Sequence, residues 1–314
     1  MTKRVAIIGA GMAGLAAARL LRDAGLTCVI FDKSRGLGGR MATRRAGELS
    51  FDHGAQYFTA RGSRFIALAE EWRAQGAAAD WFGEAIVGSP GMTAPAQAMA
   101  RGFETVMGFE VKSLRREAAG WTLRAGDGSH GGFDAVVVAI PAPQAEPLLE
   151  TGGLSFPELA SVAYAPCLAL MLAFDGPVAF EGESLRLDSG PVAWIARNSS
   201  KPGRTDAKQT FVVHAGPDWS RAHIDHTPEA ILEMLLPFAL DLIGAKSPPV
   251  HAVAHRWRYA LVERAAGVPC LWNGQAGVGA CGDYCFGPRV EAAFDSGEAM
   301  ARTMLDHWVK DGSR

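Results

Sequence analysis

Three glycines and one acidic residue near the amino terminus have a spacing that suits phosphate and ribose binding. The segment GAGMAG places Gly9, Gly11 and Gly14 in the pattern G-x-G-x-x-G. The first glycine of such a pattern permits a tight turn, the second lets the backbone approach a pyrophosphate, and the third lets a helix pack closely on a strand. Asp32 lies 18 residues after Gly14, where a carboxylate accepts hydrogen bonds from an adenosine ribose. These residues predict a dinucleotide site.

A basic, glycine-rich stretch follows Asp32 directly and reads KSRGLGGRMATRR. Guanidinium groups bind phosphates bidentately, and glycines allow a loop to pass close to a ligand. A solvated basic loop or a nucleic-acid patch would have a similar composition. The net charge of −2 argues against nucleic acid, which favours a strongly basic domain. Because the stretch follows the glycine pattern and Asp32, we interpret it as a clamp for one pyrophosphate.

The elements around these residues form a strand–helix–strand unit. RVAIIG is a short apolar run that ends at Gly9 and predicts a buried parallel strand. MAGLAAARLLRDAG has helical periodicity and ends at Gly25, and LTCVIFD predicts a second strand. A unit of about 30 residues is the size expected for a nucleotide-binding βαβ unit.

The middle of the chain has a different pattern of predicted secondary structure, with several strands and one long helix. APCLALMLAFD, GPVAWIAR, QTFVVHAG and PVHAVAHRWRYAL predict strands, whereas TPEAILEMLLPFALDLIG predicts a helix capped by Thr227 with Pro228 at its first position. VMGFEVKSLRRE and GWTLRAGDGSH predict a hairpin-like insertion. We therefore expect an α/β fold with a Rossmann-like domain and a second α+β domain built on an antiparallel sheet. The predicted boundaries are 1–57, 101–160 and 266–314 for the first domain, and 58–100 and 161–265 for the second.

Composition excludes several other classes of protein. The five cysteines are an odd number without a disulfide framework, which favours a reducing, cytoplasmic compartment. No apolar stretch of 18 residues predicts a membrane span, and no histidine or cysteine spacing predicts a metal site. The chain also lacks the G-x-S-x-G and H-E-x-x-H motifs of hydrolases.

The basic stretch resembles the second fingerprint of FAD-binding amine oxidases and phytoene desaturases, R-x-G-G-R-x-x-[ST]. Here it runs from Arg35 to Thr43, with one extra residue before the glycine pair. Further segments resemble bacterial renalase-type flavoproteins, with His53 and Tyr284 as modest departures. These segments are FDHGAQYFTAR, GMTAPAQAMA, WIARNSSKPGR, AHRWRYA and CGDYCFGPRVEAAFDSGEAMA.

The resemblance implies that the Rossmann-like domain binds FAD non-covalently. Arg40 would lie along the pyrophosphate, Val111 near the adenine, and Asp283 near the ribityl chain or pyrophosphate, with the following helix pointing its amino terminus at the flavin. The predicted cofactor contacts are Gly9, Gly11, Met12, Ala13, Gly14, Asp32, Lys33, Arg35, Gly39, Arg40, Ala55, Gln56, Val111, Asp283, Arg289 and Val290. The predicted substrate contacts are Tyr57, Phe58, Thr59, Ala60, Arg61, Met92, Thr93 and Asn198.

The renalase resemblance also implies an activity: oxidation of 2- or 6-dihydro isomers of NAD(P) to NAD(P)+, with hydride transfer to the flavin and reduction of O2 to H2O2. No catalytic acid or base is expected, because the product is a stable cation and the cofactor carries the chemistry. An FAD-dependent amine oxidase is the alternative enzyme. A non-catalytic flavin-binding protein, or a nucleic-acid-binding protein, is the alternative of a different class.

Overall fold

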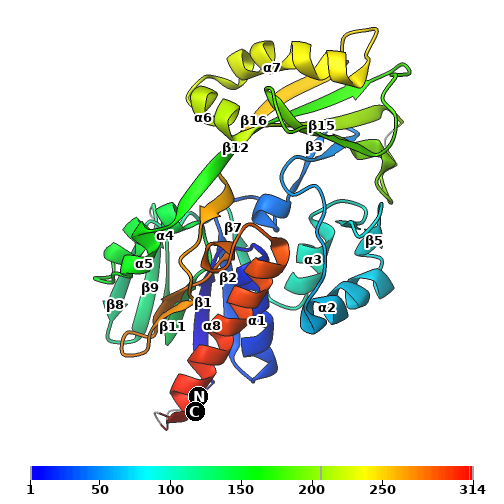
Figure 1. The fold of residues 1–314 in the computed structure, drawn as a ribbon. Helices are drawn as coiled ribbons and strands as arrows, with labels where there is room; N and C mark the ends of the chain where they lie inside the picture. Colours follow the sequence, from blue (N-terminus) through cyan, green and yellow to red (C-terminus); the bar gives the residue numbers. More distant parts are fainter. Residues whose placement is uncertain (1, 127, 206, 311, 313–314) are drawn as a thin grey trace.

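A computed structural model describes residues 2–126, 128–205, 207–310 and 312. Its lower body in Figure 1 contains a six-stranded sheet in the order β17-β18-β11-β1-β2-β7. All neighbouring strands are parallel except the edge pair β17–β18. The strands are β1 (Arg4–Ile8), β2 (Thr27–Asp32), β7 (Glu104–Met107), β11 (Ala135–Val138), β17 (Leu271–Asn273) and β18 (Val278–Ala280). The predicted α/β fold with a Rossmann-like sheet is confirmed.

Two different layers cover this sheet. Along β1, Val5 and Ile7 face a core shared with helices α1 (Met12–Asp23) and α8 (Val290–Lys310), whereas Ala6 and Ile8 face a core shared with an antiparallel meander. Burial on both faces explains why the strand is apolar throughout. The meander consists of β8 (Ser113–Glu117), β9 (Gly120–Ala125) and β10 (Gly128–Phe133). Helices α4 (Ala142–Glu150) and α5 (Pro157–Ala160) follow β11.

One part of the hairpin prediction was wrong. Val106 and Met107, expected in the hairpin-like insertion, pair instead with Phe31 and Asp32 as strand β7 of the parallel sheet. The turn at Gly108 has a φ of +73° and ends β7 before the meander begins. An apolar run predicts a strand but does not identify its partner.

The second sheet is antiparallel and forms the upper body of Figure 1. Helices α6 (Pro217–His223) and α7 (Pro228–Ile243) cover one of its faces. The predicted start of α7 is confirmed, because Thr227 Oγ1 accepts a hydrogen bond from the amide of Ala230 at 3.2 Å. The sheet order is β13 (Ser184–Arg186), β14 (Val192–Arg197), β15 (Gln209–Ala215), β12 (Ala163–Phe174) and β16 (His251–Arg264).

The other face of the antiparallel sheet receives the hairpin of β3 (Thr43–Ala46) and β4 (Leu49–Asp52), whose Phe51 packs on Met171 and Val212. Helices α2 (Ser63–Ala74) and α3 (Ala94–Ala100), with the short strands β5 (Ala78–Asp80) and β6 (Ile86–Gly88), lie beside the lower body. Side chains of α2 and α3 share a core with α1 and α8. This packing groups residues 58–100 with the parallel sheet; the predicted domain boundaries remain a prediction.

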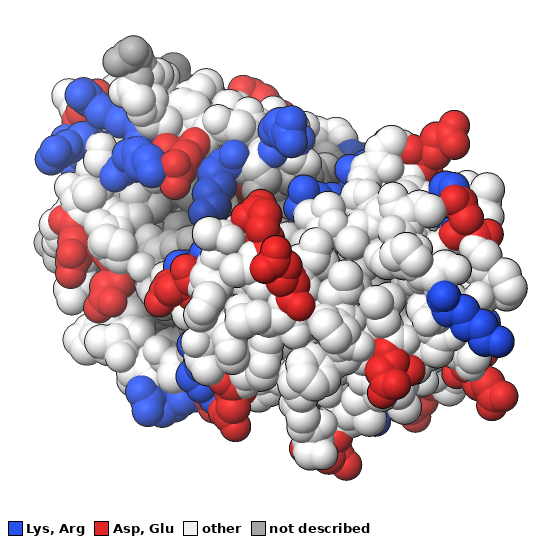
Figure 2. Space-filling model, turned by 90° about the horizontal axis from the view of Figure 1, so that it is seen from above, with Lys and Arg blue, Asp and Glu red and all other residues white. Residues whose placement is uncertain are grey.

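Three features of the structure relate to nucleic-acid binding, membrane spanning and metal binding. On the face shown in Figure 2, basic and acidic side chains are interspersed. Within the described ranges, no helix combines the length and apolar character needed to cross a membrane. The same part of the chain contains no cluster of three or more histidine, cysteine or acidic residues able to hold a metal ion.

Candidate functional site

The glycine turn between β1 and α1 leaves one side open and closes the other. Gly9 has a φ of +111°, a conformation that favours glycine. A Cβ added at Gly14 would lie 2.1 Å from the carbonyl oxygen of Gly9, so the helix packs on the strand through a bare Cα. A Cβ added at Gly11, in contrast, would meet no atom within 4 Å. The start of α1 therefore presents backbone amides to an open side, as anion binding requires.

Asp32 is held at the end of β2 by backbone amides. Its Oδ2 accepts a hydrogen bond from Ala10 N at 2.8 Å, and its Oδ1 accepts one from Ser34 N at 2.7 Å. Each carboxylate oxygen retains capacity for a further donor. The amide of Phe109 donates to the carbonyl oxygen of Asp32 at 2.9 Å, which brings the segment leading to Val111 beside this carboxylate. Ribose and adenine contacts predicted for these residues are thus compatible in space.

The second glycine stretch docks onto the first. Gly38 N donates to the carbonyl oxygen of Ala10 at 2.9 Å, and a Cβ added at Gly39 would lie 3.8 Å from the Cα of Gly11. The 3-10 turn η1 (Gly39–Met41) then carries Arg40. Lys33 and Arg35, predicted on the adenosine side, are exposed in the connecting loop.

Arg40 and Asp283 form a bidentate ion pair. The distances are 2.7 Å from Nη1 to Oδ2 and 2.6 Å from Nη2 to Oδ1, and Nη1 also donates to the carbonyl oxygen of Ala260 at 3.1 Å. Asp283 is buried in the 3-10 turn η3 (Asp283–Cys285). Burial acts to lower the pKa of Arg40, but Asp283 outweighs it and raises that pKa, so Arg40 stays charged.

A buried glutamate ties the start of α8 to the chain that precedes α2. Glu291 Oε1 accepts hydrogen bonds from Gly62 N at 2.5 Å and Arg61 N at 3.2 Å. Val290 packs into the helix-side core, whereas the side chains of Arg61 and Arg289 are exposed. Within the described residues, neither of these guanidinium groups forms an ion pair. The sequence did not single out Glu291.

The segment of residues 53–57 runs between Arg40 and the antiparallel sheet. Ala55 N donates to the carbonyl oxygen of Arg40 at 2.9 Å. The carbonyl oxygen of His53 accepts a hydrogen bond from Trp257 Nε1 at 2.9 Å and lies 3.2 Å from His214 Nε2. At the far end, the ring of Tyr57 lies 5.8 Å from that of Trp194. We call residues 53–57 the wall segment.

Histidines beside the wall segment are neutral at pH 7. Burial lowers the pKa of His53 to about 3 and the pKa values of His214 and His255 to about 4, and nearby positive charges add to the effect. Because a backbone carbonyl only accepts, the contact of His214 with His53 places the imidazole proton on Nε2.

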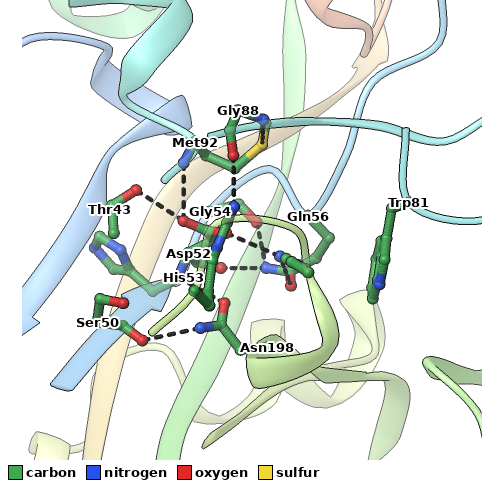
Figure 3. A network of polar contacts seen from close by, with 12 residues as sticks. Thr43, Ser50, Asp52, His53, Gly54, Gln56, Trp81, Gly88, Met92 and Asn198 are labelled. Atoms are coloured by element: carbon green, nitrogen blue, oxygen red, sulfur yellow. Dashed lines mark hydrogen bonds and ion pairs between the residues drawn. The ribbon is translucent and has the colours of Figure 1, made fainter. Parts of the chain in front are cut away.

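Behind the wall segment lies the buried carboxylate of Asp52 (Figure 3). Its Oδ1 accepts hydrogen bonds from Thr43 Oγ1 at 2.7 Å and Met92 N at 3.0 Å. Its Oδ2 pairs with Lys201 Nζ at 3.1 Å and with Arg204. Burial raises the pKa of Asp52, but the two cations outweigh it and hold the pKa well below its ordinary value. Burial lowers the pKa of Lys201 to about 8, against the attraction of Asp52.

Two amide side chains complete this network. Gln56 Nε2 donates to the carbonyl oxygen of Gly54 at 2.9 Å and to that of Asp52, while its Oε1 accepts from Lys201 Nζ at 3.2 Å. Asn198, in the 3-10 turn η2 (Asn198–Ser200), accepts from Asp52 N at 3.2 Å and donates to the carbonyl oxygen of Ser50 at 2.9 Å (Figure 3). Both amides are buried, so neither side chain faces open space.

The predicted substrate contacts divide into two groups. The first group is partly or fully exposed and consists of Tyr57, Thr59, Ala60 and Arg61. The second group is buried: Phe58 and Met92 lie in the core, and the amide of Asn198 is hydrogen-bonded within the network. Thr93 Oγ1 accepts a hydrogen bond from Thr43 N at 2.7 Å. We therefore leave the side chains of Phe58, Met92 and Asn198 out of the proposed substrate contacts.

The open side of this region fits FAD. Gly11 leaves room for a pyrophosphate beside Arg40, and Asp32 retains acceptor capacity for a ribose. Met12 and Ala13 have buried side chains and can contribute only backbone amides. Cys285 is buried, and burial raises the pKa of its thiol to about 11, which makes it a poor nucleophile for a covalent flavin bond.

Comparison with solved structures supports the same fold. The chain is similar to a protein from Exiguobacterium sp. 255-15 provisionally named a protoporphyrinogen oxidase, with a TM-score of 0.75, 14% identity and coverage of 98% of this chain and 99% of that one. It is similar to cyclohexylamine oxidase from Brevibacterium oxydans IH-35A, with a TM-score of 0.72, 13% identity and coverage of 98% and 100%. Putrescine oxidase bound to putrescine gives a TM-score of 0.71, 14% identity and coverage of 98% and 99%.

Sequence comparison identifies the family. A segment of 68 residues is 37% identical to human flavin-containing amine oxidase B, covering 21% of this chain and 13% of that protein. Residues 7–72 match the family model of the NAD(P)-binding Rossmann-like domain, and residues 62–305 match that of the flavin containing amine oxidoreductases. The second match spans more than half of the 314 residues. The chain therefore belongs to the flavin containing amine oxidoreductase family and uses FAD as its cofactor.

Proposed function

We propose that this protein oxidises isomeric dihydro forms of NAD(P), reduced at ring position 2 or 6, to NAD(P)+. When bound, FAD would supply the redox chemistry as the acceptor of the hydride, with O2 as the final oxidant that is reduced to H2O2. The residues of the chain bind and orient the substrate and exclude water. No proton has to be removed from the substrate, because loss of the hydride leaves a pyridinium cation.

The observation that carries this proposal is that two exposed arginines, Arg61 and Arg289, lie on neighbouring stretches of backbone: Glu291, two residues after Arg289, accepts a hydrogen bond from the amide of Arg61. A dinucleotide substrate carries a diphosphate, and unpaired guanidinium groups are suitable partners for it. Asp283 pairs with Arg40 and Glu291 binds two backbone amides, so Asp295, which interacts electrostatically with Arg289, is the carboxylate that offsets part of this positive charge. This charge distribution favours an anionic substrate over a cationic one.

The partly exposed rings of Tyr57 and Trp257 offer apolar surface for a flat nicotinamide at the two ends of the wall segment, and the buried ring of Trp194 supports that of Tyr57. The neutral histidines beside them add polarity without charge. The partly exposed Thr59 and Ala60 follow shortly after Tyr57 in the chain and, together with the partly exposed Thr93, complete the proposed substrate contacts.

An amine oxidase is the second candidate, and the family itself favours it. Putrescine oxidase and cyclohexylamine oxidase share the fold along nearly the whole chain. An amine substrate binds as a cation or must lose a proton, and then a carboxylate or an aromatic cage is expected around the nitrogen.

Anaerobic stopped-flow spectroscopy distinguishes the two candidates. We expect 2- or 6-dihydro-NAD(P) to bleach the flavin absorbance, whereas putrescine, cyclohexylamine and ordinary 4-dihydro-NADH do not. The double variant R61Q/R289Q should raise the KM for the dihydro isomers at least tenfold with little change in kcat, because it removes contacts to the non-reacting diphosphate. Bleaching by an amine and not by the isomers would replace this proposal with the amine oxidase.

A further inference from the structure

The side chain of Lys201 is completely buried, and its ammonium contacts polar groups behind the wall segment and one aromatic ring. Its Nζ lies 3.1 Å from Asp52 Oδ2, 3.2 Å from Gln56 Oε1 and 5.1 Å from the ring centre of Trp81. Arg204 reaches the same carboxylate oxygen of Asp52. The cluster thus holds two cations and one carboxylate, which is more positive charge than neutralising Asp52 requires.

The ammonium of Lys201 and two backbone carbonyl oxygens together fix which way the amide of Gln56 points. An ammonium has donors only, so it must face Oε1. Nε2 is then directed at the carbonyl oxygens of Gly54 and Asp52, which accept its two hydrogens. A flipped amide would set Nε2 against the ammonium and Oε1 against two carbonyl oxygens; these three repulsive contacts outweigh the one hydrogen bond that Oε1 would gain from His214 Nε2, 3.3 Å away.

The amide of Gln56 in turn holds the backbone of the wall segment. Fixing the carbonyl oxygens of Asp52 and Gly54 fixes the peptide units around His53 and Ala55. The Gly54–Ala55 unit carries the amide that donates to Arg40, and the peptide unit between the two fixed ones carries the carbonyl oxygen of His53 that Trp257 and His214 contact. Gly54 itself packs so tightly that an added Cβ would lie 2.0 Å from the carbonyl oxygen of Arg40.

Lys201 and the wall segment belong to different parts of the fold. Lys201 follows β14 of the antiparallel sheet and lies 145 residues from Gln56 in the sequence. Arg40, on the other side of the wall segment, belongs to the second glycine stretch beside the parallel sheet. A buried contact from one sheet therefore sets the backbone that lies against the other.

We propose that Lys201 is a positioning residue for the flavin site, which acts through the amide of Gln56 to hold the wall segment against Arg40 in a single arrangement. The inference rests on the proposed function only for the substrate used to measure the rate. The competing view is that Lys201 merely neutralises Asp52, in which case Gln56 and Lys201 act independently on the flavin.

The test uses the FAD-loaded enzyme and the variants K201M, Q56M and K201M/Q56M, compared at equal FAD occupancy. We expect K201M to lower the rate of anaerobic flavin reduction by a dihydro-NAD isomer at least tenfold and to alter the visible circular dichroism of the flavin. K208M is the matched control, because Lys208 pairs with Asp175 on the surface. It should match the unmodified protein in both measurements.

The double variant K201M/Q56M distinguishes the positioning role from simple neutralisation of Asp52. If Lys201 acts through Gln56, K201M/Q56M should be no slower than the slower single variant, because both changes remove the same contact. Multiplicative effects of the two changes on the rate would overturn the proposal. D52N/K201M is prepared as well, since it removes the carboxylate that K201M leaves with a single buried cation. If D52N/K201M folds with an unmodified flavin spectrum and rate, Lys201 has no positioning role.

The outcome is separable from the proposed function. If no dihydro isomer reduces the flavin of the unmodified protein, the proposed substrate is wrong. The flavin circular dichroism of the unmodified protein, K201M, Q56M and K201M/Q56M still reports on the wall segment. An unchanged flavin spectrum in K201M, together with normal FAD affinity, contradicts the positioning role whatever the substrate is.

Discussion

Arg40 and Asp283, 243 residues apart in the sequence, bind each other through two parallel hydrogen bonds of 2.7 and 2.6 Å. The pair joins the second glycine stretch to the turn before α8. Gly39, the residue before Arg40, lies against Gly11, where an added Cβ would meet no atom within 4 Å. The pair therefore holds a cation close to the position proposed for the pyrophosphate.

Asp283→Asn should weaken FAD binding about 10- to 100-fold. Loss of a charge-assisted hydrogen bond costs roughly 1.5–3 kcal/mol, and each 1.4 kcal/mol is about a factor of ten in affinity. Titration of the apoprotein with FAD, followed by flavin fluorescence, measures the change. Asp225→Asn, which removes an exposed pair with Arg258, is the control and should leave the affinity unchanged. Equal affinities for the two variants would show that the pair does not orient Arg40.

Gly14→Ala should lower the stability of the apoprotein, whereas Gly11→Ala should lower its affinity for FAD. A Cβ at Gly14 would collide with the carbonyl oxygen of Gly9 at 2.1 Å, so we expect a loss of about 2 kcal/mol in the free energy of unfolding of the apoprotein. A Cβ at Gly11 meets no protein atom, so the apoprotein should remain stable while FAD affinity falls about tenfold or more, because the methyl group occupies the ligand's side.

Urea unfolding of the apoprotein and FAD titration separate these two effects. Gly176→Ala serves as the control, since an added Cβ there also meets no atom within 4 Å and Gly176 lies outside both glycine stretches. Normal FAD affinity of the Gly11 variant would place the phosphates elsewhere.

The first strand–helix–strand unit was predictable because its information is local. The glycine spacing, the helix between two apolar runs and Asp32 all fall within about 30 residues, and each matches a periodicity or a turn requirement. The start of α7 was predictable for the same reason, since Thr227 and Pro228 act on the first turn of their own helix. Strand β7 was misassigned because its partner, β2, lies far away in the sequence.

The network around Asp52 could not be predicted from periodicity or spacing. Asp52 and Lys201 are separated by 149 residues, and neither charge differs in sequence from one on the surface. Both lie in segments that carry the resemblance to renalase-type flavoproteins, FDHGAQYFTAR and WIARNSSKPGR, but a resemblance does not state which residues meet. Only the packing of hairpin β3–β4 on the antiparallel sheet brings them together.

His53 should make the protein less stable as the pH falls from 7 to 5. Its pKa is about 3 in the folded protein and about 6.5 in an unfolded chain, so over this range the unfolded chain takes up a proton that the folded protein refuses. At 1.36 kcal/mol per pH unit, the free energy of unfolding falls by roughly 2 kcal/mol between pH 7 and pH 5 from this residue alone.

His53→Asn tests the assignment, because asparagine does not titrate. Urea unfolding of both proteins at pH 5, 6, 7 and 8 should show a shallower acid loss for the variant, by about 2 kcal/mol between pH 7 and pH 5. Between pH 7 and 8 the two curves should run nearly parallel, since the imidazole is then mostly neutral in both states. Parallel curves down to pH 5 would mean that His53 takes up a proton in the folded protein and that its imidazole reaches solvent or an acidic partner beside the wall segment.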